Sequence, residues 1–253
     1  MKKLAILFGM VLLMPVVSHA DNTAAGTAAF IMPGEVSDDL LGGARIDIWF
    51  KTKLNVNRSY AIMAWFPGQE SITAAPGVAA PMVFSDAGVT PATGLSTATE
   101  GEGSPASSGQ DHMKATFEPA ATGTYWIRLT TSATGVSPEL LHVLIQETTL
   151  FSPWTSKAAG FEGFIELHNN TSETLNLTLR AFDQLGVLQG SGLTLTAPPN
   201  ATVFRTATQV GVPVNVFAGL VLTHDGAPGA MSGNITTLNG ANGLSFDSPF
   251  TGR

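Results

Sequence analysis

Turn-forming residues interrupt the second half of the chain about every ten positions, and short apolar or alternating blocks lie between them. No apolar repeat with the 3.6-residue spacing of a helix persists for ten residues in either half. Short strands joined by tight turns are typical of a β-sandwich. The predicted strands of the second half lie within residues 161–170, 174–183, 186–200, 201–210, 216–226, 230–240 and 243–250.

The first half carries the strand signal in a stricter form, because ARIDIWFKTKL (44–54) alternates residue by residue. Its two isoleucines, Phe50 and Leu54 share one face, whereas Trp49 falls among the charged residues of the other. Further strands are predicted within residues 59–66, 113–119, 124–131 and 139–150. We expect the 113–119 and 124–131 strands to pair as a hairpin, which makes the first half all-β as well.

The stretch FEPAATGTYWIRL (117–129) begins with a turn that contains proline and glycine and then enters a strand. Tyr125, Ile127 and Leu129 recur at every second position, so we expect all three in the core, with Trp126 on the opposite face. A tyrosine just inside a strand resembles the tyrosine corner of β-sandwiches, in which the phenol oxygen bonds to the backbone a few residues upstream.

The first 20 residues have the three-part layout of a secretory signal peptide. Lys2 and Lys3 precede the apolar run LAILFGMVLLMPVV (4–17), and small residues stand before the predicted cleavage site after Ala20. The run is too short to span a bilayer, although an uncleaved N-terminal anchor is the alternative. We therefore expect an exported protein, periplasmic or extracellular.

An exported chain without cysteine must be stabilised by core packing, because it has no disulfide framework. The formal net charge is −7, and it becomes about −9 when the two signal lysines are removed. Such an acidic chain lacks the basic footprint that nucleic-acid binding needs. The longest later apolar run, residues 212–222, carries Asn215 and is too short for a membrane span. We expect neither a nucleic-acid partner nor a membrane span.

Two domains are predicted after the signal peptide, residues 21–148 and 149–253, with no flexible linker between them. The boundary falls in ETTLFSPW (147–154) and leads into an irregular connection over residues 151–160. We expect Trp154 to fill the joint between the domains.

Residues 85–111 contain almost no large apolar side chain. Such a segment cannot bury enough surface to offset the entropy of ordering it. We expect a long flexible surface loop there, and leave open whether it is disordered or closes over a ligand.

The first half resembles the bacterial pre-peptidase C-terminal-type domains, which are small β-sandwiches found beside secreted hydrolases or standing alone. FEPAATGTYWIRL and the preceding DIWFKTKLNVNRSYAIMAW (47–65) carry the resemblance, which spans roughly residues 30–147. The second half resembles an uncharacterised β-sandwich unit of exported bacterial proteins, through ETTLFSPW, THDGAPGAMSGNITTLN (223–239) and GLSFDSPF (243–250). The resemblances imply two packed β-sandwich domains of jelly-roll or immunoglobulin-like type and no chemistry.

Nucleophilic catalysis would need a serine, a base and a carboxylate in one place. The best cluster is His224 and Asp225 with Ser232 downstream, but neighbouring residues on a strand point to opposite faces. His-Asp-Gly at the end of a strand is more simply a turn, and the chain has no G-x-S-x-G stretch. We expect no catalytic site, with a secreted hydrolase as the alternative.

The histidine spacing and the absence of thiols offer no zinc site. Glu35, Asp38 and Asp39 cluster in GEVSDD, and loop carboxylates are the ligands that calcium prefers. The D-x-[DN]-x-[DN]-G pattern is missing, and acids in a loop are usually just solvated. We expect no cofactor, and calcium at these three carboxylates is the alternative.

Trp49 and Trp126 are out of phase with the apolar positions of their strands, so they are the candidate ligand-binding residues. Flat aromatic rings complement the apolar faces of sugars. The alternative is that both rings cover the second face of a sheet, against the other domain.

Together these patterns predict a non-catalytic extracytoplasmic binding, adhesion or structural accessory protein that recognises a cell-surface glycan or a protein. A second alternative is a subunit of a surface assembly, joined by strand addition at an open sheet edge.

Overall fold

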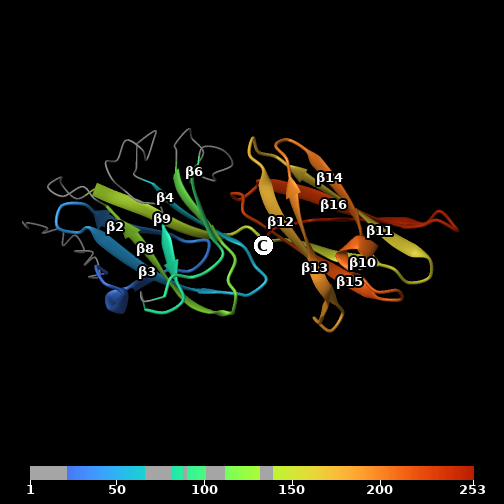
Figure 1. Ribbon diagram of the computed structural model, residues 1–253, viewed down its shortest axis with the longest axis horizontal. Coiled ribbons are helices and arrows are strands. Elements are labelled where there is room, and N and C mark those ends of the chain that lie inside the picture. Colours follow the sequence, from blue (N-terminus) through green and yellow to red (C-terminus); the bar gives the residue numbers. More distant parts are fainter. Residues whose placement is uncertain (1–21, 66–80, 88–89, 101–111, 132–138) are drawn as a thin grey trace, which may run out of the picture.

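The computed structural model describes residues 22–65, 81–87, 90–100, 112–131 and 139–253. The predicted signal peptide lies outside these ranges. The described strands form four sheets that pack in two pairs, so the predicted all-β fold of β-sandwiches is confirmed. The two sandwiches lie end to end along the long axis of the molecule (Figure 1). No helix among the described residues is both long and apolar enough to cross a membrane.

The first sandwich consists of two sheets, which we call sheets I and II. Sheet I has the strand order β1-β3-β8-β5, namely Ala29–Phe30, Asp47–Leu54, Gly123–Thr130 and Met82–Phe84. Sheet II has the order β2-β9-β4-β7-β6, namely Val36–Leu41, Glu139–Glu147, Tyr60–Trp65, His112–Phe117 and Leu95–Glu100. A short 3₁₀ helix, η1 (Ala25–Thr27), precedes β1. Neighbouring strands are antiparallel except β1 and β3, which run parallel.

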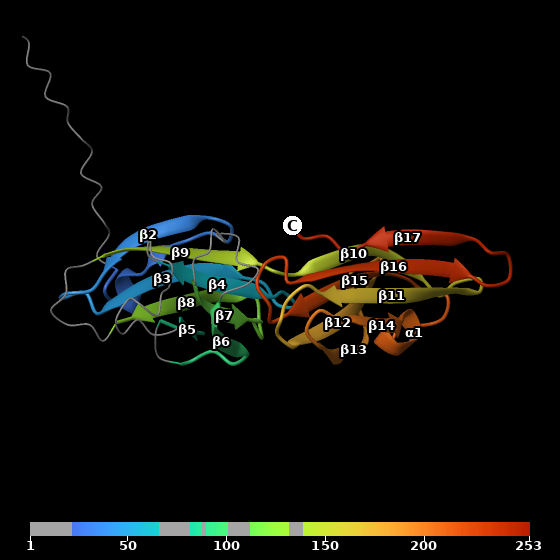
Figure 2. The same ribbon diagram turned by 90° about the horizontal axis from the view of Figure 1, so that it is seen from above.

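The second sandwich consists of sheets III and IV (Figure 2). Sheet III has the order β10-β15-β12-β13, namely Leu150–Ser156, Phe217–His224, Leu175–Asp183 and Leu188–Ala197. Sheet IV has the order β14-β11-β16-β17, namely Thr202–Thr206, Phe161–Asn169, Met231–Asn239 and Ser245–Pro249. One helical turn, α1 (Ala207–Val210), follows β14.

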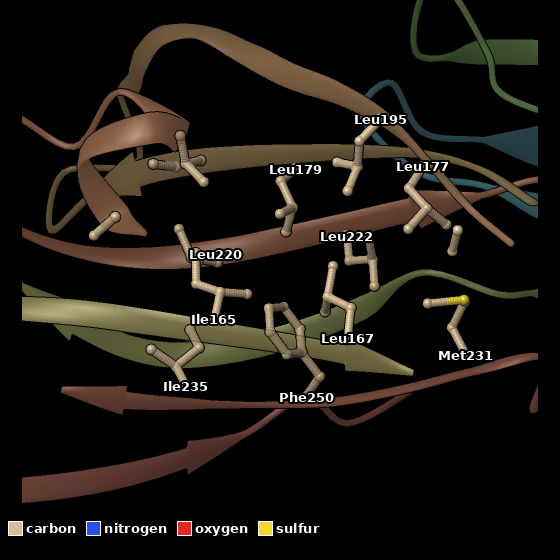
Figure 3. Packing of buried hydrophobic residues seen from close by; sticks show 14 of the residues in the cluster. Ile165, Leu167, Leu177, Leu179, Leu195, Leu220, Leu222, Met231, Ile235 and Phe250 are labelled. Atoms are coloured by element: carbon tan, nitrogen blue, oxygen red, sulfur yellow. The ribbon is translucent and has the colours of Figure 1, made fainter. Parts of the chain in front are cut away.

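Each sandwich has its own apolar core, because alternate residues of the facing sheets point inward. In the second sandwich, Leu179, Leu220 and Leu222 of sheet III face Ile165 and Ile235 of sheet IV (Figure 3). All five side chains are almost completely buried. This packing of two sheets explains why apolar and polar residues alternate in the short strand segments of the second half.

The tyrosine corner is confirmed. Tyr125, Ile127 and Leu129 of β8 are buried in the first core, as the alternation predicts. The Tyr125 hydroxyl donates a hydrogen bond to the carbonyl oxygen of Ala121 at 2.8 Å. Its ring also meets Phe117 edge-on, with the centroids 5.1 Å apart. The side chain therefore fixes the turn that leads into β8.

The predicted hairpin of residues 113–119 and 124–131 is wrong. β7 pairs with β4 and β6 in sheet II, whereas β8 pairs with β3 and β5 in sheet I. The turn between β7 and β8 thus crosses from one sheet to the other. Turn composition shows where a strand ends but does not choose its partner, which depends on burial against distant strands.

The predicted loop over residues 85–111 is wrong in part, because β6 lies within it. β6 pairs antiparallel with β7 at the edge of sheet II, with Leu95 opposite Phe117 and Glu100 opposite His112. Backbone pairing at an edge needs no large apolar side chain, so a Ser- and Thr-rich strand escapes a test based on composition. The parts of the prediction that cover residues 88–89 and 101–111 lie outside the described residues.

The two sandwiches meet through polar contacts at one end of sheet III. Arg180 forms an ion pair with Glu118, which lies in the turn after β7. The Thr223 hydroxyl donates to the same carboxylate at 2.9 Å, and the His224 N–H donates to the Ser59 hydroxyl at 3.3 Å. Contacts of this type hold the orientation of two domains without merging their cores.

Tyr60, the first residue of β4, provides a test of this packing at high pH. Its side chain is fully buried, and its oxygen accepts a hydrogen bond from the Asn55 N–H at 3.1 Å. Burial is the main cause that raises the pKa of the Tyr60 hydroxyl above its ordinary value of 10.0. The folded state therefore holds this proton more tightly than the unfolded state. The associated stability is complete below pH 10.0 and is lost as the pH rises through the raised pKa.

We expect Tyr60→Phe to make the free energy of unfolding less dependent on pH above pH 10.0. Urea unfolding of the two proteins, repeated from neutral to strongly alkaline pH, measures the difference. Comparison with the variant removes the contribution of lysines, which titrate in the same range. Parallel alkaline curves for the two proteins would contradict the assignment.

Candidate functional site

The tryptophans singled out by the sequence lie together on the outer face of sheet I. Trp49 is only 7% exposed, because the segment around η1 covers it. The backbone N–H of Trp49 donates to the backbone carbonyl of Asn22 at 2.8 Å, and the Trp49 ring lies 5.3 Å from that of Phe84. A stacking platform needs an exposed ring, so the prediction that Trp49 binds a ligand is wrong. Trp126 packs against the same cluster and is partly buried, and its role in binding stays a prediction.

The three acidic residues proposed for calcium do not form a common site. Asp38 and Asp39 are neighbours on β2, so their side chains point to opposite faces. Asp38 pairs with His142 of β9, whereas buried Asp39 accepts from Arg45 at 3.1 Å. Glu35 is exposed before the strand begins. Among the described residues, no group of three or more His, Asp or Glu side chains is placed to hold a metal ion.

The residues of the hydrolase alternative bind different partners. The buried His224 ring accepts a hydrogen bond from the Gly226 N–H at 3.1 Å. Asp225 accepts from both the backbone and the side chain of Asn176, at 2.8 and 2.6 Å. Ser232 lies on β16, in the opposite sheet. Asp225 thus ties the end of β15 to the start of β12, and the His224 ring holds the turn that follows β15.

A groove of about 640 Å³ on the outer face of sheet III is the best candidate for a binding site. Its size falls within the range of small-molecule sites, roughly 300–1,000 Å³. We call it the aromatic groove, because four aromatic rings form its walls. Its lining includes Arg58, Phe151, Trp154, Phe182, Asp183, Gln184, Phe217, Gly219 and Arg253.

A β-bulge in β10 places Trp154 in the groove. Ser152 pairs with Leu220 and Thr155 with Ala218, so two residues of β10 stand opposite Gly219 alone. The extra residue lets both Ser152 and Thr155 face the core, where they are completely buried. Trp154 turns to the outside and stacks on Phe217, with ring centroids 6.2 Å apart.

Gly219 forms the floor of the groove. It stands between the bulge of β10 on one side and Phe182 of β12 on the other. Because glycine has no side chain, a hollow remains between the rings of Trp154 and Phe182. A Cβ at this position would meet only ordinary van der Waals contacts, the nearest at 3.5 Å. The hollow can therefore be filled by substitution without breaking the sheet.

Two arginines lie at the end of the groove nearest the first sandwich. The Arg58 guanidinium lies 4.0 Å from the centroid of the Phe151 ring, and Arg253 lies 4.6 Å from it. Arg58 also forms an ion pair with Glu147 at 3.2 Å. This end of the groove offers N–H donors beside an aromatic ring.

Asp183 closes the opposite wall, at the turn between β12 and β13. Its carboxylate accepts hydrogen bonds from the N–H groups of Leu185 and Val187, each at 2.9 Å. Gln189 donates to its second oxygen at 2.8 Å. Asp183 thus shapes the wall, and the exposed Gln184 beside it is the group free to reach a ligand.

None of the sequence patterns predicted this groove. The predicted irregular connection over residues 151–160 is wrong in large part, because β10 occupies most of that range. The predicted place of Trp154 in the joint between the domains is wrong as well. The ring contacts of Trp154 are with Phe217 and Phe246, both in the second sandwich. The sequence holds one weak signal, Pro153, since proline within a sheet is confined to edge strands, first residues of strands and bulges.

Comparison with known proteins gives little further guidance. Neither a protein-family model nor a curated protein matches the chain, so the resemblance to pre-peptidase C-terminal-type domains stays a prediction. Among solved structures, the chain is similar to one described as a putative secreted protein from Eubacterium rectale. The two are 9% identical, with a TM-score of 0.28, over 91% of this chain and 81% of that one. At that score the likeness carries no argument about function.

Proposed function

We propose that this is a non-catalytic extracytoplasmic protein that binds a cell-surface glycan through the aromatic groove. The observation that carries the proposal is the bulge that turns Trp154 outward beside Phe217 and above the bare floor of Gly219. The predicted signal peptide supports export. The separate partners of His224 and Asp225, and the place of Ser232 in the opposite sheet, support a role in binding rather than in catalysis.

Saccharides fit the chemistry of the groove. A sugar ring has an apolar face that packs on aromatic rings and a rim of hydroxyls that needs hydrogen-bonding partners. Trp154, Phe182 and Phe217 supply the rings, whereas Arg58 and Gln184 supply polar groups at the rim. The sheet holds the rings in place, so little order is lost on binding.

A glycan and peptidoglycan array, probed with residues 21–253, tests the proposal. We expect binding to at least one saccharide, and Trp154→Ala to weaken it at least about fivefold, since a stacked ring contributes roughly 1 kcal/mol beyond its buried area. Gly219→Val should abolish binding, because its methyl groups fill the floor while its Cβ fits.

Phe204→Ala is the matched control. Phe204 is 64% exposed on sheet IV, outside the groove, so its loss should leave binding unchanged. A protein that binds no saccharide on the array, or that binds equally well with Gly219→Val, would refute the proposal. Circular dichroism of each variant verifies that it is folded.

A further inference from the structure

A second hollow lies next to the aromatic groove and shares two of its rings. It has a volume of about 460 Å³ and is lined by Trp154, Ala158, Ala159, Phe161, Phe217 and Phe246. We call it the annex. Every lining side chain is apolar, whereas the groove also contains arginine, aspartate and glutamine. The two hollows thus differ in chemistry although they meet at the same wall.

The annex lies beyond the groove along β10. This strand begins at the joint, where Phe151 contacts Arg58 of the first sandwich, and it runs away from the joint (Figure 2). Trp154 follows along the strand, and Ala158 and Ala159 come after the strand has ended. The order of these residues places the polar end of the combined site at the joint and the apolar end at the far side.

The aromatic rings of the annex are ordered by one another but not covered. Trp154 meets Phe246 edge-on at 5.5 Å, and Phe246 lies 6.0 Å from Phe161. Phe217 and Phe246 nevertheless remain 41% and 49% exposed. Exposed rings that are held in a fixed arrangement around a hollow form a preorganised apolar site.

We infer that the annex takes an alkyl or acyl substituent of the saccharide that the groove holds. The inference rests on the proposed function, and it names the ligand class as an amphipathic saccharide. The shared wall of Trp154 and Phe217 is the structural reason, since a ligand stacked on these rings in the groove reaches the annex by crossing their edge. Apolar chains gain free energy there in proportion to the surface that they remove from water.

Methyl and n-octyl β-D-glucoside, the latter below its critical micelle concentration, test the annex by isothermal titration calorimetry. The measured quantity is the ratio of their affinities for each protein. We expect the octyl compound to bind at least about tenfold more tightly to the unmodified protein, which is the gain from roughly two buried methylenes.

Phe246→Ala should reduce this ratio to about one, whereas Phe204→Ala should leave it unchanged. Phe246 lines the annex and not the groove, and it is half exposed on an edge strand, so the variant should fold. An undetectable affinity for the octyl compound, or a ratio retained in Phe246→Ala, would overturn the inference. The two proposals can also fail separately. If the octyl compound binds more tightly than the methyl compound but no glycan binds on the array, the proposed function is refuted and the annex remains an apolar binding site.

Discussion

Replacing Gly163 with alanine should destabilise the second sandwich by about 1–3 kcal/mol, the usual effect of overpacking a core. Gly163 lies on β11 and faces the core opposite β10. A Cβ on Gly163 would lie 2.1 Å from the Thr155 hydroxyl, far closer than two atoms can approach. The hydroxyl cannot move away freely, because Thr155 is completely buried and its Oγ1 lies 3.3 Å from that of Thr237. Urea unfolding measures the loss.

A double variant separates this clash from a general loss of strand stability. With Thr155→Ala also present, the nearest remaining side-chain contacts of the new Cβ are at 3.3 Å to Ala207 and 3.4 Å to the Cβ at position 155. Gly163→Ala should therefore be much less destabilising in the Thr155→Ala background than alone. Equal losses in both backgrounds would mean that the contact between β10 and β11 does not limit the size of the residue at 163.

The sequence predicts the class of fold because apolar residues alternate along each strand and so indicate which face of the strand is buried. In β3 and β8, the alternating positions Ile48, Phe50, Tyr125 and Ile127 all enter the first core. This information is local, since it depends on neighbours within one strand. The choice of partner strand is not local. Thus β7 and β8 are adjacent in sequence and yet belong to facing sheets, which no turn residue between them reveals.

The burial of aromatic residues was harder to predict than the class of fold. The outer face of a sheet, which does not meet the core, can also be covered by another segment of the chain. Trp49 lies on the polar face of β3, as its phase predicts, but the segment that contains Asn22 and Ala28 packs over it. The parallel pairing of β1 with β3 brings this segment there. A pairing between residues some twenty positions apart leaves no periodic trace in either strand.

The candidate site depends on a single inserted residue. Without the bulge, strict alternation would point either Ser152 or Thr155 away from the core, and Trp154 would follow Ser152 inward. Neither hydrophobicity nor charge distinguishes a bulged strand from a regular one. Glycine at 219 and proline at 153 are compatible with the bulge, but both residues also occur in ordinary turns.

Ile235→Ala should destabilise the second sandwich by about 2–5 kcal/mol and leave the first nearly unaffected. Ile235 is completely buried between sheets III and IV, and it touches neither the joint nor the groove (Figure 3). Ile127→Ala is the matched variant in the first core, since Ile127 is also completely buried. The two substitutions remove the same atoms from different cores, so any difference between them reports on the coupling of the sandwiches.

Tyrosine absorbance follows the first sandwich alone, because both tyrosines of the chain, Tyr60 and Tyr125, lie in it. Calorimetry follows the whole protein. We expect Ile127→Ala to lower the midpoint of the tyrosine signal by roughly 8–20 °C, which follows from about 4 °C per kcal/mol in a domain of between 100 and 150 residues. Ile235→Ala should instead lower a separate calorimetric transition. If it moved the tyrosine midpoint by the same amount, the polar joint of Glu118, Arg180 and Thr223 would couple both cores into one cooperative unit, and the predicted division into residues 21–148 and 149–253 would fail as a description of folding.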